Sequence, residues 1–339
     1  MVVYSDSRDL ETARKAMIAG ARDFLPRPVR PEVLRDSVLK AMALEENRRL
    51  RAKGELPAQA TAGTIITVFG PKGGIGKSTL STNLAVSLAR QGTAPVAVVD
   101  LDNGFGDITG MLDVHAEKTL VDLIRDLDKL GREDVRKYLA KHAQSGLEVL
   151  AAPSLLEWRE IDPDDVRRAL EKLAQSYDKI VIDTGGALNG VTEAALELAT
   201  IVLWVTTTEF ASVRDSIEAM RALRQLNFPQ DRMRVVVNSI FPDDTVRASA
   251  VQDAMQTEIF WQVPYEKKVR QGTHLGQPIV VTAPGSVAAR SFEGLAAVIS
   301  GGKAGASTNG HGTSKSLFRW RSGPEDKAAA PAAAPAEGS

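Results

Sequence analysis

The sequence predicts an α/β fold in which a mostly parallel sheet carries helices on both faces. Between residues 64 and 300, short apolar runs alternate with longer amphipathic stretches, as expected of strands joined by crossover helices. The runs are hydrophobic almost throughout, which suits strands buried on both faces. A glycine-rich loop separates the first of these runs from the helix that follows it. Together these observations predict a parallel sheet with a glycine-rich loop after its first strand.

The composition is that of a folded protein without a strong charge. Hydrophobic residues make up 43% of the 339 positions and charged residues 25%, both close to the globular average. Lys and Arg number 42 against 43 Asp and Glu, a net charge of −1 that argues mildly against DNA as the main partner. No stretch reads as a secretory signal or as a membrane span. We therefore expect a cytoplasmic protein.

Several kinds of site are excluded or disfavoured by composition. The chain has no cysteine, which excludes disulfides, thiolate zinc sites and a cysteine nucleophile. The histidines are scattered without a metal-ligand spacing: His115, His142, His274 and His311. We expect them to be ordinary surface or loop residues and not metal ligands.

The N-terminal region, residues 1–47, reads as half of an α/β unit. We expect a strand at Val2–Tyr4, a helix through Ala19, a strand at Asp23–Leu25 and a helix from Pro31 to Glu46. Residues 48–63 are first charged and then rich in Ala, Gln, Thr, Pro and Gly, which predicts a linker.

The region 64–300 is predicted to be one large α/β domain. Its expected strands are Ile65–Phe69, Val96–Val99, Leu147–Leu150, Lys179–Ile182, Ile201–Val205 and Arg234–Val237. Helices are expected at Leu80–Arg90, Asp164–Gln175 and Ser212–Leu226, where apolar residues recur every three or four positions. Residues 301–339 are dominated by Gly, Ala, Ser, Thr and Pro and are predicted to be disordered, with one aromatic and basic cluster at 317–321.

The glycine-rich loop carries the chemistry. Such a loop wraps its backbone N–H groups around a polyphosphate, and the following helix turns its positive dipole end towards the same group. Lys77 is expected to reach the β- and γ-phosphates and the Ser78 hydroxyl to ligate Mg²⁺. Pro71 stands where the usual P-loop pattern has glycine, so the match is not strict. The residues expected to bind nucleotide are Gly73, Gly74, Ile75, Gly76, Lys77, Ser78 and Thr79.

The segment Lys72-Gly-Gly-Ile-Gly-Lys-Ser78 resembles the signature of the deviant Walker A ATPases, the ParA/MinD superfamily. In that family two protomers enclose two ATP molecules, and the signature lysine reaches the phosphates bound by the partner. The resemblance covers residues 64–300 and implies a homodimer that forms on ATP, with ATP and Mg²⁺ as cofactors. It assigns catalytic roles to Lys72 and Lys77.

Two carboxylate segments fit the same resemblance. Val98-Val-Asp-Leu-Asp102 looks like the family's switch I, which implies that Asp102 orients the attacking water and that Asp100 lies near the metal. The run 177–183 ends an apolar strand with Asp183, the Walker B arrangement, which implies a metal ligand. Further along, the resemblance implies that Asn238 hydrogen-bonds the adenine and that Pro264 and Tyr265 lie beside the base.

The branch of the superfamily has to be read outside the loop. Residues 2–5 and 16–29 resemble the second half of a response-regulator receiver domain, with Ser5 at the switch hydroxyl and Arg27 replacing the usual Lys before Pro28. The strands that carry the phosphoacceptor Asp are missing, so phosphorylation at the family's site is excluded for this chain as given. We expect either a truncated start or a degenerate docking module. A receiver-like module joined to a deviant Walker A ATPase resembles the CpaE/TadZ proteins, which position the assembly machinery of Tad/Flp-type pili at the cell pole.

Three other interpretations stay open. A MinD-like septum-site ATPase carries a C-terminal amphipathic membrane helix, for which 314–322 is short. A ParA-like partitioning ATPase needs a basic face for DNA, for which the candidates are Arg214, Arg221, Arg224, Arg232 and Arg234. A scaffold gated by nucleotide without important turnover is the third. We expect a slow, dimerising Mg²⁺-ATPase with a protein partner in pilus assembly or polar localisation, and with membrane contact only through that partner or the tail.

Overall fold

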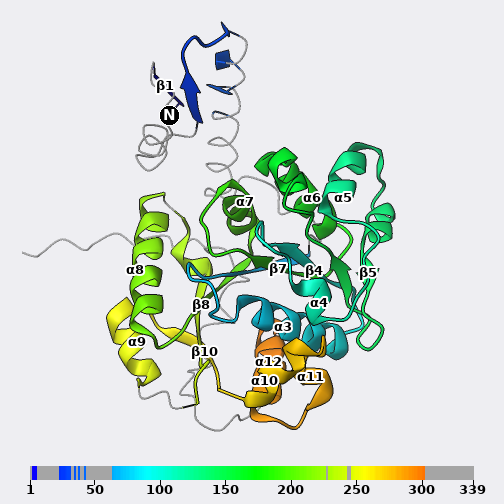
Figure 1. Cartoon of the computed structure of the whole chain (residues 1–339), viewed down its shortest axis with the longest axis vertical. Helices are drawn as coiled ribbons and strands as arrows, with labels where there is room; N and C mark the ends of the chain where they lie inside the picture. The colour runs from blue at the N-terminus through cyan, green and yellow to red at the C-terminus, as the bar shows by residue number, and fades with distance from the viewer. Residues whose placement is uncertain are drawn as a thin grey trace, which may run out of the picture.

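The structure is a computed structural model that describes residues 2–5, 23–31, 34–35, 37–38, 42, 63–226, 228–242 and 246–301. Within these residues one large sheet is flanked by helices (Figure 1). The predicted helix before Ala19, the linker residues 48–62 and the tail 302–339 with its 317–321 cluster lie outside the described residues. Of the predicted helix 31–46, the described positions are helical: Pro31, Leu34, Arg35, Ser37, Val38 and Met42.

The two N-terminal strands form a small sheet of their own. Strands β1 (Val2–Ser5) and β2 (Asp23–Pro26) pair in parallel, with Val2 opposite Asp23 and Ser5 opposite Pro26. The backbone N–H of Arg27 donates to the Ser5 carbonyl at 2.8 Å. Both strands are where the sequence predicted them.

Among the described residues the main sheet has eight strands in the order β10-β9-β8-β3-β7-β4-β6-β5, and all neighbours are parallel except β5 and β6. This order confirms the predicted fold class. All six predicted strands are present, with bounds shifted by one or two residues, and β5 and β10 are additional. The strands are β3 (Thr64–Phe69), β4 (Val96–Leu101), β5 (Ala140–Lys141), β6 (Glu148–Leu150), β7 (Lys179–Thr184), β8 (Ile201–Thr206), β9 (Met233–Asn238) and β10 (Ile259–Val263).

The three predicted helices are α3, α6 and α8, each displaced by one to three residues at its ends. Helix α6 begins at a proline that follows Asp162, whose side chain accepts a hydrogen bond from the Asp164 N–H, a typical N-terminal cap. The helices of the main body are α3 (Lys77–Gln91), α4 (Ile108–Met111), α5 (Leu120–Asp126), α6 (Pro163–Ala174), α7 (Gly190–Leu198), α8 (Phe210–Gln225), α9 (Ala248–Met255), α10 (Lys267–His274), α11 (Ile279–Thr282) and α12 (Val287–Ile299).

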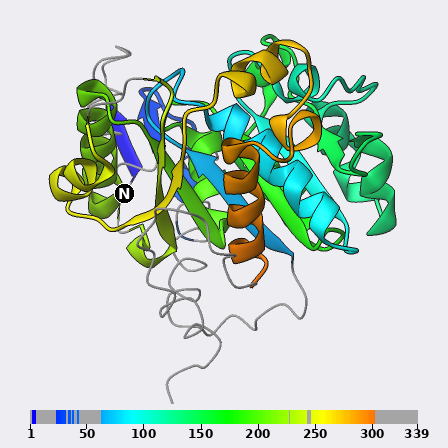
Figure 2. The same ribbon diagram turned by 90° about the horizontal axis from the view of Figure 1, so that it is seen from below.

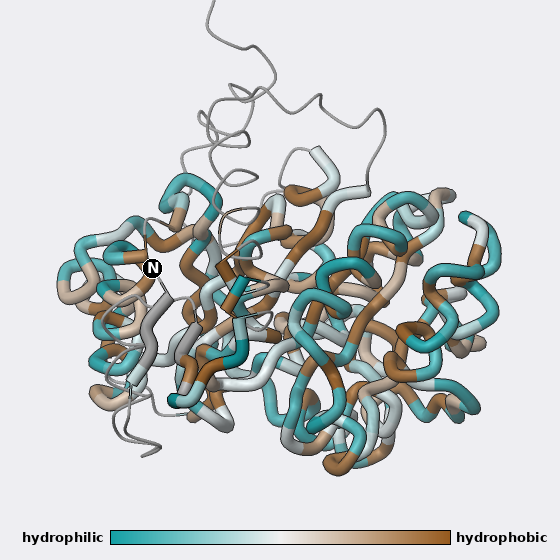
Figure 3. Tube along the Cα trace, turned by 90° about the horizontal axis from the view of Figure 1, so that it is seen from above, coloured by the Kyte–Doolittle hydropathy of each residue, from teal (hydrophilic) through white to brown (hydrophobic). Residues whose placement is uncertain are grey.

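The central strand β3 shows why helices cover both faces. Its residues alternate, with Ile66 and Val68 packing against α3 and α12, and Ile65 and Phe69 packing into the clusters on the opposite face. Figure 2 shows α12 (orange) beside α3 (cyan) across one face of the sheet. Helices α5 to α9 supply the other face. The hydrophobic segments accordingly run along the strands in the middle of the molecule (Figure 3).

The topology places the carboxyl ends of the parallel strands along one edge. The chain passes from β3 to β4 on one side, and after β7 it crosses to β8 on the other side of β3. In open α/β sheets ligands bind outside the carboxyl ends of strands, where the strand order reverses. The glycine loop after β3 lies at this point.

Candidate functional site

The glycine loop joins β3 to α3 in a shape that only glycine adopts easily at two positions. Gly74 and Gly76 have φ of +77° and +88°, in the left-handed region. At Gly76 a Cβ atom would also lie 2.3 Å from Nδ2 of Asn238. At Gly73 and Gly74 nothing lies within 4 Å of an added Cβ, so the loop backbone, called the cradle below, borders open space. This cradle can admit a phosphate chain close to the backbone.

Helix α3 begins inside the loop. It is 15 residues long, has no acidic residue in its first turn, and turns its N-terminal N–H groups towards the cradle. The flanking side chains of Ser78 and Thr79 are half-buried, while Ile75 is packed into the core. The predicted nucleotide-binding residues 73–79 thus form one continuous turn at a helix N-terminus, a geometry that favours anions.

Lys77 lies at the centre of the charges. Its side chain is buried and its Nζ donates to the Lys72 carbonyl at 3.2 Å. Burial lowers the pKa of Lys77, and the nearby carboxylates of Asp183 and Asp102 act in the opposite direction. The structure therefore brings one cation of the loop and two of the predicted acidic residues together.

Asp183 is buried at the end of β7. Its Oδ1 accepts a hydrogen bond from the Ser81 hydroxyl at 2.7 Å, and Ser78 on the same helix also acts to lower its pKa. Within the part of the chain that the structure describes, its Oδ2 has no hydrogen-bond partner. Burial raises the pKa of Asp183 to about 6, against the opposing effects of Ser78, Ser81 and Lys77. A buried oxygen without a partner is costly, and a cation would satisfy it.

Asp100 faces Asp183 across the paired strands β4 and β7. Its two oxygens accept backbone N–H groups, Oδ1 from Asp102 and Oδ2 from Ile108, each at 3.1 Å. Burial, together with the charge of Asp183, raises the pKa of Asp100 to about 7. A Cβ on Gly106 would lie 2.7 Å from the Asp100 Oδ2. Asp100 therefore anchors the whole predicted switch segment.

Asp102 lies next to the loop after β7. Its Oδ1 accepts the Gly104 N–H at 2.9 Å in a local turn, and the same atom would be 3.2 Å from a Cβ on Gly185. The carboxylate is half-exposed at the carboxyl edge of the sheet, beside Lys77. Its charge therefore acts on Lys77 of the loop.

Asn238 contacts the loop directly. Its Nδ2 donates to the Ile75 carbonyl at 2.8 Å from the end of β9. This amide therefore supports the loop, a contact that the sequence did not predict. Pro264 and Tyr265 follow β10, one strand beyond β9 and three strands from β3, and Tyr265 is 40% exposed.

Comparisons with known proteins agree with this geometry. The AAA domain family matches residues 63–227. The septum site-determining protein MinD of Thermotoga maritima is 26% identical over 247 residues, covering 70% of this chain and 89% of that protein. A ParA family ATPase from Chlorobium tepidum superposes with a TM-score of 0.64 at 22% identity, over 69% of this chain and 98% of that one. MinD of Pyrococcus horikoshii, solved with Mg-ADP, superposes with a TM-score of 0.61 at 24% identity, over 70% of this chain and 96% of that one.

The chain has the fold of the ParA/MinD P-loop ATPases and resembles them in sequence.

In this ATPase two residues at the site were not predicted from the sequence. Ser81 holds Asp183, and its signal was available because it lies one turn after Lys77 on the same helix. Glu209 forms an ion pair with Lys72, with Nζ and Oε2 3.6 Å apart. That contact depends on the adjacency of β8 and β3, which the local sequence does not encode.

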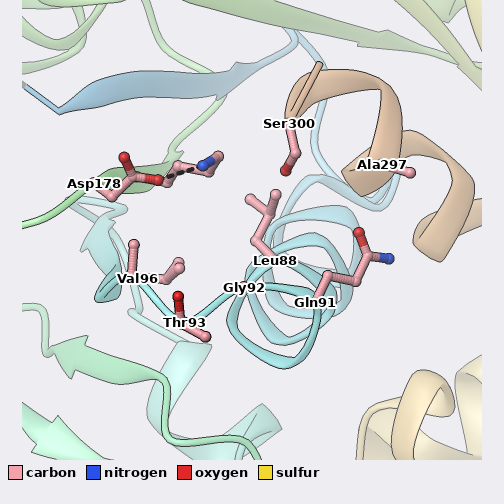
Figure 4. Close-up of a pocket in the computed structure, with 10 residues that line it drawn as sticks. Leu88, Gln91, Gly92, Thr93, Val96, Asp178, Ala297 and Ser300 are labelled. Carbon is pink, nitrogen blue, oxygen red and sulfur yellow. Dashed lines mark hydrogen bonds and ion pairs between the residues drawn. The ribbon is translucent and has the colours of Figure 1, made fainter. Parts of the chain in front are cut away.

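A cavity of about 350 Å³ lies at the opposite edge of the sheet (Figure 4). The last turns of α3 and α12 and the starts of β4 and β7 line it with Leu88, Gln91, Val96, Asp178 and Ser300. None of the predicted site residues of the ATPase reaches it. Among the described residues no helix is both long and apolar enough to cross a bilayer.

Proposed function

We propose that the chain binds ATP with Mg²⁺ in the cradle after β3 and hydrolyses it slowly. The single observation that carries this proposal is the buried Oδ2 of Asp183, which has no partner among the described residues and lies beside a Ser78 hydroxyl. Oxygen atoms from a carboxylate and a serine hydroxyl are the donors that Mg²⁺ prefers at a nucleotide site. The solved MinD of P. horikoshii carries Mg-ADP, which supports the same ligand here.

The residues present fit the metal. Ser78 and Asp183 would hold Mg²⁺, with Asp100 behind them as the support of Asp102. Bound there, the metal would neutralise charge between the β- and γ-phosphates. The loop amides would hold the phosphates, and Lys77 would add its charge to the oxygens of the transferred group. Asp102 would orient the water that attacks the γ-phosphorus as the bond to the β-phosphate oxygen breaks, giving ADP and phosphate.

We infer that ATP drives homodimerisation through the same edge of the molecule. The Lys72 side chain is 31% exposed and pairs with Glu209, outside the loop itself. It is therefore available to the phosphates of a second copy. Large hydrophobic side chains are also exposed in segments that follow the carboxyl ends of the strands: Phe105, Leu156, Phe210, Phe241 and Tyr265. Exposed apolar groups of this size favour burial against a partner.

The cellular role that we propose is that of the CpaE/TadZ proteins, the positioning or regulation of Tad/Flp-type pilus assembly. Support comes from the parallel pair β1 and β2, which lies where the receiver-like resemblance predicts two neighbouring strands. The domain limits we propose are a partial receiver-like module at 1–47, a linker at 48–63, the ATPase at 64–300 and a tail at 301–339. The protein would lie in the cytoplasm at a cell pole.

A MinD-like septum-site role is the second candidate, favoured by the match that covers 89% of MinD of T. maritima. A ParA-like role on DNA has less support, because the candidate cations already have polar partners. Arg214 pairs with Asp215, Arg221 with Glu218, Arg224 with Gln230, and Arg232 and Arg234 donate to backbone carbonyls. Asp215 and Glu218 therefore offset the charges of Arg214 and Arg221, which leaves a weaker basic face for a phosphate backbone.

The role can be tested by a three-way comparison on the full chain loaded with ATP. Association with a pilus secretion ATPase supports the CpaE/TadZ assignment. Sedimentation with anionic vesicles in the absence of that partner supports the MinD assignment, and salt-dependent binding to duplex DNA supports the ParA assignment. Either of the last two results without the first would overturn the pilus proposal.

A further inference from the structure

The Lys72 side chain lies against the start of α8 of its own chain. Its Nζ is 3.6 Å from Oε2 of Glu209, and the two side chains are 31% and 39% exposed. Lys72 is the residue that the dimer proposal sends across to a second copy. In the single chain, the same ammonium group has an intramolecular carboxylate as its partner.

The position of Glu209 is fixed by the turn before α8. Its backbone N–H donates to the Thr207 hydroxyl at 3.3 Å, and the buried Thr207 in turn donates its N–H to the Ser212 hydroxyl at 3.0 Å. Glu209 is the N-cap residue of α8, yet its side chain makes no capping hydrogen bond. Capping positions favour Ser, Thr, Asp or Asn. The carboxylate of Glu209 does not cap the helix: its Oε2 pairs with Lys72 and accepts a hydrogen bond from the Thr207 hydroxyl at 3.4 Å.

We propose that Glu209 is a positioning residue that holds Lys72 on its own subunit until a second ATP-loaded copy docks. The proposal rests on the proposed dimerising ATPase function and adds a restraint to it. For Lys72 to reach across, its ion pair with Glu209 breaks, and in a symmetric dimer it breaks once in each protomer. Dimerisation therefore breaks two of these ion pairs, whereas nucleotide binding breaks none. The restraint lowers the dimer constant and hardly changes nucleotide affinity.

The strength of the restraint follows from its exposure. An ion pair between two partly exposed side chains changes an equilibrium by about 1.5- to 5-fold. Because two pairs break per dimer, removal of the carboxylate should strengthen ATP-dependent dimerisation by about 2- to 25-fold. A contact of this strength weakens dimerisation and does not prevent it.

The test uses Glu209→Gln, Lys72→Ala and the double variant in the full chain. Glu218→Gln is the matched control, because it removes one negative charge from the same helix at a residue paired with Arg221. Light scattering with ATP and Mg²⁺ gives the dimer constant, and fluorescent ATP gives nucleotide affinity. Acylation of Lys72 by an amine-reactive ester, read by peptide mass spectrometry, reports the contact in the protein without nucleotide.

We expect Glu209→Gln to dimerise more tightly by the factor above with unchanged ATP affinity, and to acylate faster at Lys72. In the Lys72→Ala background the Glu209 change should have no effect on the dimer constant, and Glu218→Gln should leave all three quantities unchanged. A dimer constant that falls, or that rises equally in both backgrounds, would overturn the proposal, as would an unchanged acylation rate. Absence of ATP binding in every variant would instead overturn the proposed function, while the acylation rate would still decide on Glu209.

Discussion

Asp100 and Asp183 occupy paired positions on the adjacent parallel strands β4 and β7, and each is only 1% exposed. Two carboxylates buried at neighbouring positions disfavour each other's charge. The first accepts the backbone N–H groups of Asp102 and Ile108, and one oxygen of the second accepts the Ser81 hydroxyl of α3. The pair therefore links the metal side of the site to the segment that carries Asp102.

The buried pair predicts how stability depends on pH in the protein without nucleotide or Mg²⁺. The pKa values of about 7 for Asp100 and about 6 for Asp183 lie above the unfolded value of 3.8. Between pH 4 and 7 the folded state thus binds more protons than the unfolded state, and stability falls as pH rises. Asp183→Asn should remove part of this loss. The variant's free energy of unfolding, compared with that of the native chain, should be higher at pH 8 than at pH 5 by on the order of 2 kcal/mol. Urea unfolding at both pH values in EDTA measures it, and an unaltered pH dependence would contradict it.

A substitution at Gly73 should change ligand binding without changing the stability of the fold. Nothing lies within 4 Å of a Cβ at this position, so Gly73→Ala should leave the melting temperature unchanged. The methyl group would stand in the cradle, and ATP affinity should fall by at least about ten-fold, or 1.4 kcal/mol. Gly110→Ala, equally open but on α4, is the control. Equal ATP affinities for the two variants would show that the cradle is not the phosphate site.

Asn238 should act on the loop whatever base is bound. Its hydrogen bond to the Ile75 carbonyl is worth about 1 kcal/mol, so Asn238→Ala should weaken ATP and inorganic tripolyphosphate by a similar factor of about five. Calorimetric titration with both ligands checks this. A loss confined to ATP would leave the adenine contact as the only role of Asn238.

Lys72 is expected to act in trans. Lys72→Ala should therefore weaken ATP-induced dimerisation by more than ten-fold while ATP binding by the single chain changes little. Light scattering and fluorescent ATP binding measure the two quantities separately. An equal loss in both would show that Lys72 serves its own nucleotide.

Much of the fold could be predicted because buried parallel strands are almost continuously apolar and the glycine loop fixes where the first helix begins. The two additional strands carry weaker signals. β5 has two residues, and β10 is an edge strand whose side chains are mostly half-buried. Periodicity of so few residues does not distinguish a strand from a loop.

The site was predicted to the extent that it is local in sequence. The loop residues and the carboxylates at strand ends have a spacing that their chemistry requires. The contacts of Glu209 with Lys72 and of Asn238 with Ile75 join segments that only the strand order brings together. A single sequence does not state that β8 and β9 follow β3 in the sheet, so these contacts required the structure.

The central claim is that the loop after β3 is the ATP site, and Lys77→Ala tests it most directly. Fluorescent ATP binding with Mg²⁺ and phosphate release are measured for the native chain, for Lys77→Ala, and for Lys267→Ala as an exposed control on α10. We predict that Lys77→Ala loses at least about 100-fold in affinity, close to 3 kcal/mol, together with all measurable turnover, while the control behaves as the native chain does. Native-like ATP binding and turnover in Lys77→Ala would contradict the assignment of the site.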